Sequence, residues 1–358
     1  MEMIDIVKVI FAPALAFFVG ISITPLVSDF LYKNKMWKTS AKTVAVDGSG
    51  TPIFNKLHKD REVNTPRMGG IIVWASSFIS IVGIWSLSKV LPWNFLDKLD
   101  FLSRDQTWIP LATLLIGAFV GLVDDWMEVK NCGDHKAGGL SLKKRLLVVG
   151  SLGVLVSFWF FTKLDVTSIN IPFFDAINLG WLIIPFFTLV IIGTYAGGVI
   201  DGIDGLSGGV FATMFAAYSA IAFSYGQINL AAFNAMIVGA LLAFLWFNIP
   251  PARFYMTETG TMGLTMTLAV VAFMTDQIAG GVGIFVLPIV AFPLVITVLS
   301  VIINVTSKKL RNGKKPFLST PIHHHFEAIG WPPYKVVMRY WVISIVFAVI
   351  GIIVALVS

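Results

Sequence analysis

Acidic and histidine side chains stand at the ends of several apolar segments of this chain, where they could act on a charged substrate. The acids are Asp124, Asp125, Asp201, Asp204 and Glu258, and the histidines are His323, His324 and His325. Only 20 of the 358 residues are acidic, and a carboxylate at a membrane is costly unless it has a function or a partner. These residues are therefore the first candidates for a site.

Asp124 and Asp125 form the first candidate group. Two adjacent carboxylates repel each other, and a cation would relieve that repulsion. Magnesium suits the pair, because proteins commonly hold it with one or two carboxylates together with substrate phosphates. The alternative is that a helix simply ends here and the acids mark its boundary with water.

The segment from Asp201 to Gly205 reads Asp-Gly-Ile-Asp-Gly. If it opens a helix, the i, i+3 spacing places Asp201 and Asp204 on one face. The glycines allow the backbone to approach a ligand such as a phosphate closely. A turn with two aspartate N-caps is the structural alternative, but it accounts less well for two acids alternating with glycines.

Glu258 and the three histidines complete the candidate set. Glu258 follows the helix-breaking Pro250-Pro251 and precedes Thr259-Gly260, so it could cap the next helix or belong to a metal site. Three consecutive histidines cannot all bind one metal ion, because neighbouring side chains diverge. They could instead contact a phosphate or a base, or form a polar loop.

The composition defines the setting of these residues. Charged residues make up 13% of the chain and hydrophobic residues 56%, whereas soluble proteins carry about 25% charged residues. So few charges cannot cover a water-soluble surface, which excludes a soluble enzyme, a disordered protein and a secreted disulfide scaffold. The single cysteine, Cys132, has no partner for an internal disulfide. The chain is predicted to be an all-α, polytopic membrane protein.

Ten apolar segments are long enough to cross a membrane as helices. They lie at about 9–31, 69–91, 108–123, 146–161, 179–199, 208–225, 231–247, 261–275, 282–305 and 337–357. With no internal repeat, they predict a single membrane domain over residues 1–358. Pro288 and Pro293 should kink the ninth helix; the bend could open a groove for a lipid chain or serve packing alone.

The basic residues orient these helices. Twenty-one of the 26 Lys and Arg residues fall in the loops after helices 1, 3, 7 and 9, and basic loops face the cytoplasm. Both termini should therefore lie outside, in the periplasm. Loops 3–4, 5–6, 7–8 and 9–10 would bring the candidate residues to the cytoplasmic face. Topology and anionic membrane lipids account for the net charge of +6, so no nucleic-acid partner is expected.

Together the motifs resemble the polyprenyl-phosphate N-acetylhexosamine-1-phosphate transferases, over nearly the whole chain and in the family's order. The matching segments are Leu57-His58, 65–70, 123–125, 201–206, 248–260, 321–327, 330–332 and 335–337. The triple-histidine segment is the most specific, because it distinguishes the muramoyl-pentapeptide branch from transferases of other sugar phosphates. Two positions depart from the pattern. Gly198 replaces an asparagine expected to contact the nucleotide sugar, and Glu258 replaces an aspartate expected at magnesium.

The resemblance implies an enzyme of the bacterial inner (plasma) membrane. It would transfer phospho-N-acetylmuramoyl-pentapeptide from its UDP carrier to undecaprenyl phosphate, giving lipid I for peptidoglycan synthesis and releasing UMP. Its cofactor would be Mg²⁺. Its partners would be UDP-N-acetylmuramoyl-pentapeptide, undecaprenyl phosphate and membrane lipids, and a homodimer stays open.

The resemblance also implies roles for the candidate residues. Asp124 would be the base or orienting group for the lipid phosphate. Asp125, Asp201 and Glu258 would surround magnesium, with Glu258 as the direct ligand and Asp125 sharing the metal site. His323 and His324 would contact phosphates or nucleotide. The remaining substrate contacts would come from Asp204, Asn248, Tyr255, as a stacking face, and His325.

Two alternatives remain at this stage. The nearer one is a relative that transfers a different sugar phosphate. The distant one is an ion-coupled transporter, in which acids would be expected near the membrane midplane. The interiors of the ten predicted helices contain almost no acids, which argues against a transporter.

Overall fold

The structure is a computed structural model that describes residues 2–38, 64–103, 106–132, 139–277 and 280–358. The Leu57-His58 segment lies outside these ranges. The long helices are α1 (Met3–Lys33), α3 (Ile71–Val90), α5 (Trp108–Val129), α6 (Leu142–Lys163), α7 (Ile183–Ala196), α8 (Leu206–Ser224), α9 (Ile228–Asn248), α10 (Thr257–Gln277), α12 (Phe292–Leu310) and α14 (Pro333–Val357). Short helices are α4 (Asn94–Leu99), α11 (Gly283–Val290) and α13 (Ile322–Ala328), and 3-10 turns cover Gly180–Leu182 and Gly197–Ile200.

The prediction of an all-α polytopic membrane protein is confirmed. Within the described ranges, nine helices are long and apolar enough to cross a membrane. Helical segments are the expected solution, because only they satisfy every backbone hydrogen bond inside one span. A small antiparallel hairpin of β1 (Ser168–Ile171) and β2 (Phe174–Asn178) was not predicted.

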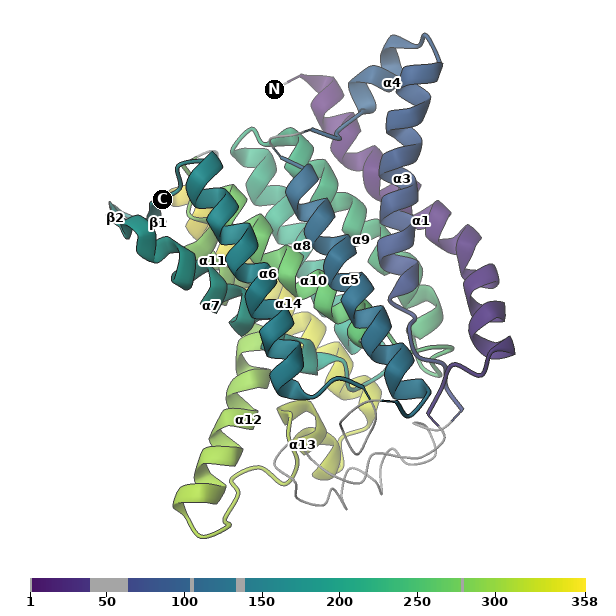
Figure 1. Cartoon of the computed structure of the whole chain (residues 1–358), viewed down its shortest axis with the longest axis vertical. Helices are drawn as coiled ribbons and strands as arrows, with labels where there is room; N and C mark the ends of the chain where they lie inside the picture. Colours follow the sequence, from purple (N-terminus) through teal and green to yellow (C-terminus); the bar gives the residue numbers. More distant parts are fainter. Residues whose placement is uncertain (1, 39–63, 104–105, 133–138, 278–279) are drawn as a thin grey trace.

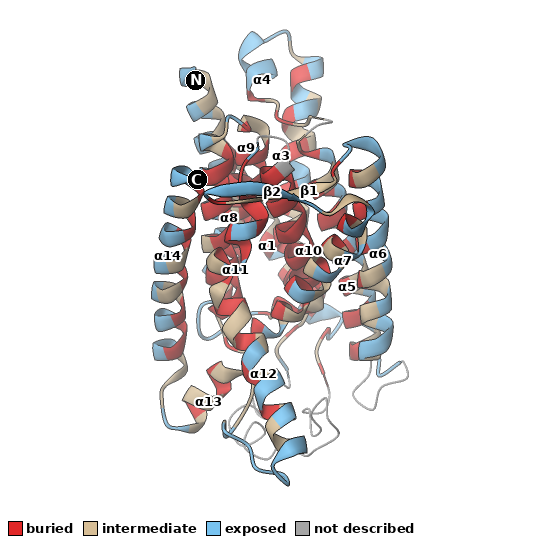
Figure 2. Ribbon diagram, turned by 90° about the vertical axis from the view of Figure 1, so that its left-hand side faces the viewer, coloured by how far each residue is buried: buried red, intermediate tan, exposed pale blue. Residues whose placement is uncertain are grey.

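The predicted eighth span corresponds to α10, which is not among those nine helices. It contains six threonines and lies at the centre of the bundle (Figures 1 and 2). From Thr257 to Asp276 every side chain is buried except Glu258, which is half-buried. A helix surrounded by protein need not be apolar on any face, because its threonine hydroxyls bond to its own backbone, as Thr265 does to Thr261.

The predicted ninth span is divided into two helices. The break falls at Ala291, between α11 and α12. Pro293 stands in the first turn of α12, where its missing N–H costs nothing, and Pro288 lies inside α11. Beyond the break α12 leans away from the bundle (Figure 1).

The two ends of the bundle differ. The chain termini and the β-hairpin lie toward one end, whereas α13 and the far end of α12 lie at the other (Figure 1). The C-terminal turns of α5 and the N-terminal turn of α10 also lie toward the α13 end. The candidate residues therefore gather at the end opposite the termini.

Candidate active site

The last turns of α5 carry three acids. The helix continues to Val129, so Asp124 and Asp125 lie within it. The sequence had placed them just beyond the end of the third span. Both side chains are fully buried, and Glu128 follows one turn later at 8% exposure. Sequence analysis missed Glu128, because a single acid among loop residues gave no signal.

Close contact between α5 and α10 brings these acids to the start of α10. A side chain at Gly121 would overlap the Glu258 carbonyl oxygen, and one at Gly117 would lie 2.9 Å from Gly263 Cα. Small residues at such a contact let two membrane helices approach backbone to backbone. As a result Asp125 lies directly against the Thr257–Thr259 turn.

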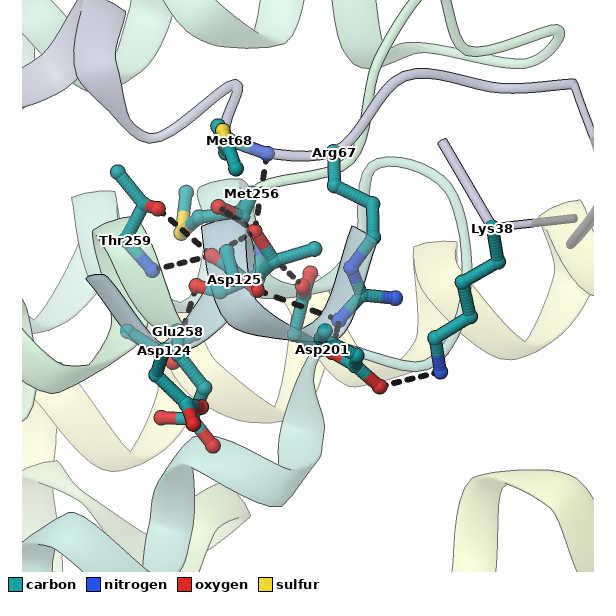
Figure 3. Close-up of polar contacts among 12 residues, drawn as sticks. Lys38, Arg67, Met68, Asp124, Asp125, Asp201, Met256, Glu258 and Thr259 are labelled. Atoms are coloured by element: carbon teal, nitrogen blue, oxygen red, sulfur yellow. Dashed lines mark hydrogen bonds and ion pairs between the residues drawn. The ribbon is translucent and has the colours of Figure 1, made fainter. Parts of the chain in front are cut away.

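Asp125 is bound on both carboxylate oxygens by the protein itself (Figure 3). Its Oδ2 accepts hydrogen bonds from the Thr257 hydroxyl at 2.5 Å, and from the Thr259 amide at 2.8 Å and hydroxyl at 2.6 Å. Its Oδ1 accepts one from the Arg67 guanidinium at 3.3 Å. The donors at Thr257 and Thr259 flank Glu258, so Asp125 fixes the backbone that carries Glu258.

Thr257 joins three separate segments. Its hydroxyl binds Asp125 and accepts a hydrogen bond from the Met68 amide at 3.1 Å, while its own amide donates to Asp201 Oδ2 at 2.7 Å. Its φ of 55° lies in the left-handed region, which is strained for a β-branched residue. Such strain persists where surrounding contacts over-determine the conformation, and the two carboxylates supply those contacts here.

The Asp201–Gly205 segment is a turn before α8 and not the first turn of a helix. Asp201 and Asp204 therefore do not share a helical face. Asp201 accepts hydrogen bonds from the Ser207 hydroxyl at 2.6 Å and from Thr257, whereas Asp204 accepts one from the Ala252 amide at 3.2 Å. Burial raises the pKa of Asp201, although these hydrogen bonds oppose the shift.

Arg145 lies between two candidate catalytic carboxylates. Its Nη2 is 2.8 Å from Asp124 Oδ2 and its Nη1 is 2.7 Å from Glu258 Oε1. Asp124 is held on its other oxygen by the Leu140 amide at 2.6 Å. The sequence did not single out Arg145, because Lys143 and Lys144 beside it are equally basic and only the packing of α6 selects one of the three.

A second arginine, Arg67, is bound to the acids of α5. Its Nη2 lies 2.7 Å from Glu128 Oε2, and Lys38 pairs with the other oxygen of Glu128. Burial by itself would lower the pKa of Arg67, but Glu128 and Asp125 outweigh burial and raise it above its ordinary value. Arg67 is therefore a permanent cation in this cluster.

Carboxylates outnumber cations among the described residues of this cluster. Its five carboxylates belong to Asp124, Asp125, Glu128, Asp201 and Glu258, and its three cations to Lys38, Arg67 and Arg145. When all are ionised, the cluster has two more negative than positive charges. Within the described ranges no three His, Cys, Asp or Glu side chains are arranged to hold a metal ion by themselves.

The histidines lie on α13, close to the Asp201–Gly205 turn. His323 and His324 are buried with ring centroids 4.3 Å apart. A Cβ atom at Gly202 would lie 2.5 Å from His323 Nε2 and 2.7 Å from His324 Nε2. His325 is separate, and its Nδ1 accepts a hydrogen bond from the Leu318 amide at 3.2 Å.

Gly202→Ala should therefore displace both imidazoles. Gly202 has no left-handed φ, so the backbone can accept alanine and the steric effect falls on the rings. A displacement of about 1 Å can cost about 10²-fold in rate, and we expect a turnover loss of that order. The matched control is Gly193→Ala on α7, where no atom lies within 4 Å of the added methyl. Equal turnover for both variants would contradict this placement of the histidines.

The remaining predicted substrate residues lie around the same turn. Asn248 is buried and joins two segments, accepting from the Gly205 amide at 2.9 Å and donating to the Phe254 carbonyl at 2.8 Å. Tyr255 is half-buried, and its backbone pairs with Pro66 and Gly69. At Gly198 an added Cβ would lie 3.4 Å from Thr261, so the position has room for little more than a methyl on that side.

Comparisons with known proteins identify the family of this chain. The profile of the family described as Glycosyl transferase family 4 matches residues 107–276, the part from α5 to α10 that carries the acids. The fold and the carboxylate cluster thus define a membrane transferase of that class.

Similarity to individual proteins extends from end to end. The phospho-N-acetylmuramoyl-pentapeptide-transferase of Shouchella clausii is 33% identical over 96% of both chains. Those of Geobacillus thermodenitrificans and Bacillus anthracis are 31% and 33% identical over at least 94% of each chain. The chain belongs to the phospho-N-acetylmuramoyl-pentapeptide transferases of the polyprenyl-phosphate N-acetylhexosamine-1-phosphate transferase family, as the motifs had predicted.

Proposed function

We propose that this transferase moves phospho-N-acetylmuramoyl-pentapeptide from UDP to undecaprenyl phosphate. A phosphate oxygen of the lipid forms a bond to the β-phosphorus of the nucleotide sugar. The bond from that phosphorus to the bridging oxygen breaks, and UMP leaves with the electron pair. The products are lipid I and UMP.

The observation that carries this proposal is the full-length similarity to phospho-N-acetylmuramoyl-pentapeptide-transferases. The position of the cluster supports it. A lipid acceptor must arrive from the bilayer and a nucleotide sugar from water, so a site at the ends of membrane helices is accessible to both. Arg67 and Arg145 supply fixed cations of the kind that stabilise phosphoryl transfer.

We further propose that magnesium binds beside Glu258. Glu258 is the one side chain of α10, as far as Asp276, that is not buried, and Asp124 lies on the other side of Arg145. Magnesium is usually held by one or two carboxylates with substrate phosphates, so a site without three protein ligands is compatible with it. When bound, the ion would offset charge on the phosphates.

The side chains divide into two proposed groups. Asp124, the proposed base or orienting group for the lipid phosphate, and Glu258 share Arg145, which fixes the direction of both. Asp125 and Asp201 bind the Thr257–Thr259 turn and so position Glu258. His323 and His324 are the proposed phosphate contacts, since they lie against the glycine between Asp201 and Ile203.

The deciding experiment is a donor comparison with purified protein. Labelled UDP-N-acetylmuramoyl-pentapeptide and UDP-N-acetylglucosamine are each incubated with undecaprenyl phosphate and Mg²⁺, and UMP release is measured. We expect release with the muramoyl-pentapeptide donor and loss of activity with EDTA. Preference for UDP-N-acetylglucosamine would instead assign the chain to a relative with another donor, and no UMP release from either would contradict the transferase proposal.

We also propose that the site faces the cytoplasm of a bacterial inner membrane, because the sequence places 21 of the 26 basic residues in or beside the predicted loops after helices 1, 3, 7 and 9, and basic loops face the cytoplasm. Cys132, the only cysteine, is exposed just beyond α5. An impermeant thiol reagent should leave it unlabelled in intact cells and label it after permeabilisation. A Cys132→Ser, Phe174→Cys variant is the matched control, because Phe174 is exposed on the hairpin at the opposite end; it should react in intact cells. The reverse pattern would overturn the orientation.

A further inference from the structure

Glu327 and His324 form a buried pair on α13. They are three residues apart on one face of the helix, and Glu327 Oε2 lies 2.8 Å from His324 Nδ1. Both side chains are only 4% exposed. At that distance a hydrogen bond joins them, and burial protects it from competition with water.

The partner at Nδ1 determines what the rest of the ring can do. An ionised carboxylate only accepts hydrogen bonds, so Nδ1 must carry the hydrogen. In a neutral imidazole the other nitrogen, Nε2, is then an acceptor; in an imidazolium it is a second donor. A carboxylate at one ring nitrogen thus selects the tautomer and the orientation of the ring.

The ring orientation points Nε2 at the Asp201–Gly205 turn. This atom lies 2.7 Å from the position that a Cβ of Gly202 would occupy. The absence of a side chain at Gly202 leaves the turn accessible to the imidazole. The His324 ring is therefore hydrogen-bonded to Glu327 through Nδ1, and its Nε2 is directed toward the candidate active site.

We infer that Glu327 is a positioning residue for the transfer reaction: it keeps a hydrogen on Nδ1 of His324, so that Nε2 is the ring nitrogen directed at the Asp201–Gly205 turn. There the Nε2–H of the imidazolium would donate to a substrate phosphate. The inference takes the identity of the substrate from the proposed function. The geometry of the pair does not depend on it. Glu327 itself contacts the histidine and not the reacting atoms.

The test combines ring-nitrogen NMR with kinetics on Glu327→Gln and Glu327→Asp. The chain has five histidines, so selective ¹⁵N-histidine labelling gives few signals, and a His324→Gln sample identifies those of His324. In the wild-type protein we expect a protonated Nδ1. In Glu327→Gln the tautomers should mix, because an amide can either donate to Nδ1 or accept from it.

The loss of turnover should parallel the change in the His324 ¹⁵N signals. We expect kcat of Glu327→Gln to fall by about 10- to 100-fold, the range seen when the partner that orients a histidine is removed at metal sites, with a smaller change in KM for the UDP-sugar. Glu327→Asp keeps a carboxylate and should recover part of both kcat and the wild-type spectrum. Asp175→Asn, an exposed carboxylate on β2, is the control and should change neither.

Two results would overturn the inference. One is an unchanged His324 spectrum in Glu327→Gln. The other is full kcat with only a lower thermal midpoint, which would make Glu327 a structural residue of α13. Failure of the proposed function is separate: the wild-type protein would then release no UMP, while the ¹⁵N spectra would still test the pair.

Discussion

Replacing Glu258 with Gln should reduce turnover by about 10²-fold or more, the loss expected when one preorganised electrostatic group is removed. Glu258 is the only incompletely buried side chain of α10 up to Asp276, and its carboxylate lies 2.7 Å from Arg145 Nη1. Glutamine keeps the shape and removes the charge. If Glu258 holds magnesium, the variant should also need a higher Mg²⁺ concentration for half-maximal turnover.

Glu258→Asp is the informative companion variant. It introduces the aspartate that the family resemblance predicts here, and it should retain activity or exceed the wild type if the longer acid is a compromise. Its carboxylate would lie about one methylene further from Arg145. Because residues in contact couple, the effects on turnover of substitutions at Glu258 and at Arg145 should not add. Turnover measured against Mg²⁺ concentration for all three proteins decides the role. Near-full activity of Glu258→Gln, with an unchanged dependence of turnover on Mg²⁺ concentration, would mean that Glu258 only caps the start of α10.

Asp125→Ala and Asp124→Ala should fail in different ways although the two residues are adjacent. Asp125 accepts from Thr257, Thr259 and Arg67. Removing one partner of a buried ion pair costs about 3–5 kcal/mol, so Asp125→Ala should unfold at a clearly lower temperature and lose activity with the fold. The strained Thr257 would also lose a contact that holds it.

Asp124→Ala should mainly lose turnover. Arg145 would keep Glu258 as a partner, so the cost in stability should be smaller, whereas loss of a base or orienting group costs about 10²- to 10⁴-fold in rate. Thermal midpoints in detergent, with UMP release normalised to folded protein, separate the two effects. Similar midpoints for both variants, both well below the wild type, would contradict this division of roles.

Much of the fold follows from the sequence because the bilayer restricts the choices. Long apolar segments must become helices in lipid, and such segments predicted nearly every long helix to within a few residues. The exceptions have local causes. The ninth span broke at Ala291 between two prolines. The third continued six residues past Val123, because the half-buried Arg67 and Arg145 let α5 carry acids that an isolated helix would place in water.

The candidate site could be predicted only in part. Acids are rare in this chain, so their positions at helix ends pointed to Asp124, Asp125, Asp201 and Glu258. Their partners were not predictable. Arg145 is one of three consecutive basic residues, and Thr257 is one of many threonines; neither has a local pattern that distinguishes it.

The sequence by itself therefore determined the class of protein, its membrane helices and its family, and it supplied the acids and histidines of the candidate site. Only the tertiary structure decided which of those acids accept hydrogen bonds from the Thr257–Thr259 turn and which lie against Arg145. Asp124 and Asp125 are neighbours in sequence, yet one faces Arg145 and the other faces the Thr257–Thr259 turn. The reason is physical: consecutive residues of a helix point about 100° apart, and what each one meets depends on helices packed from distant parts of the chain.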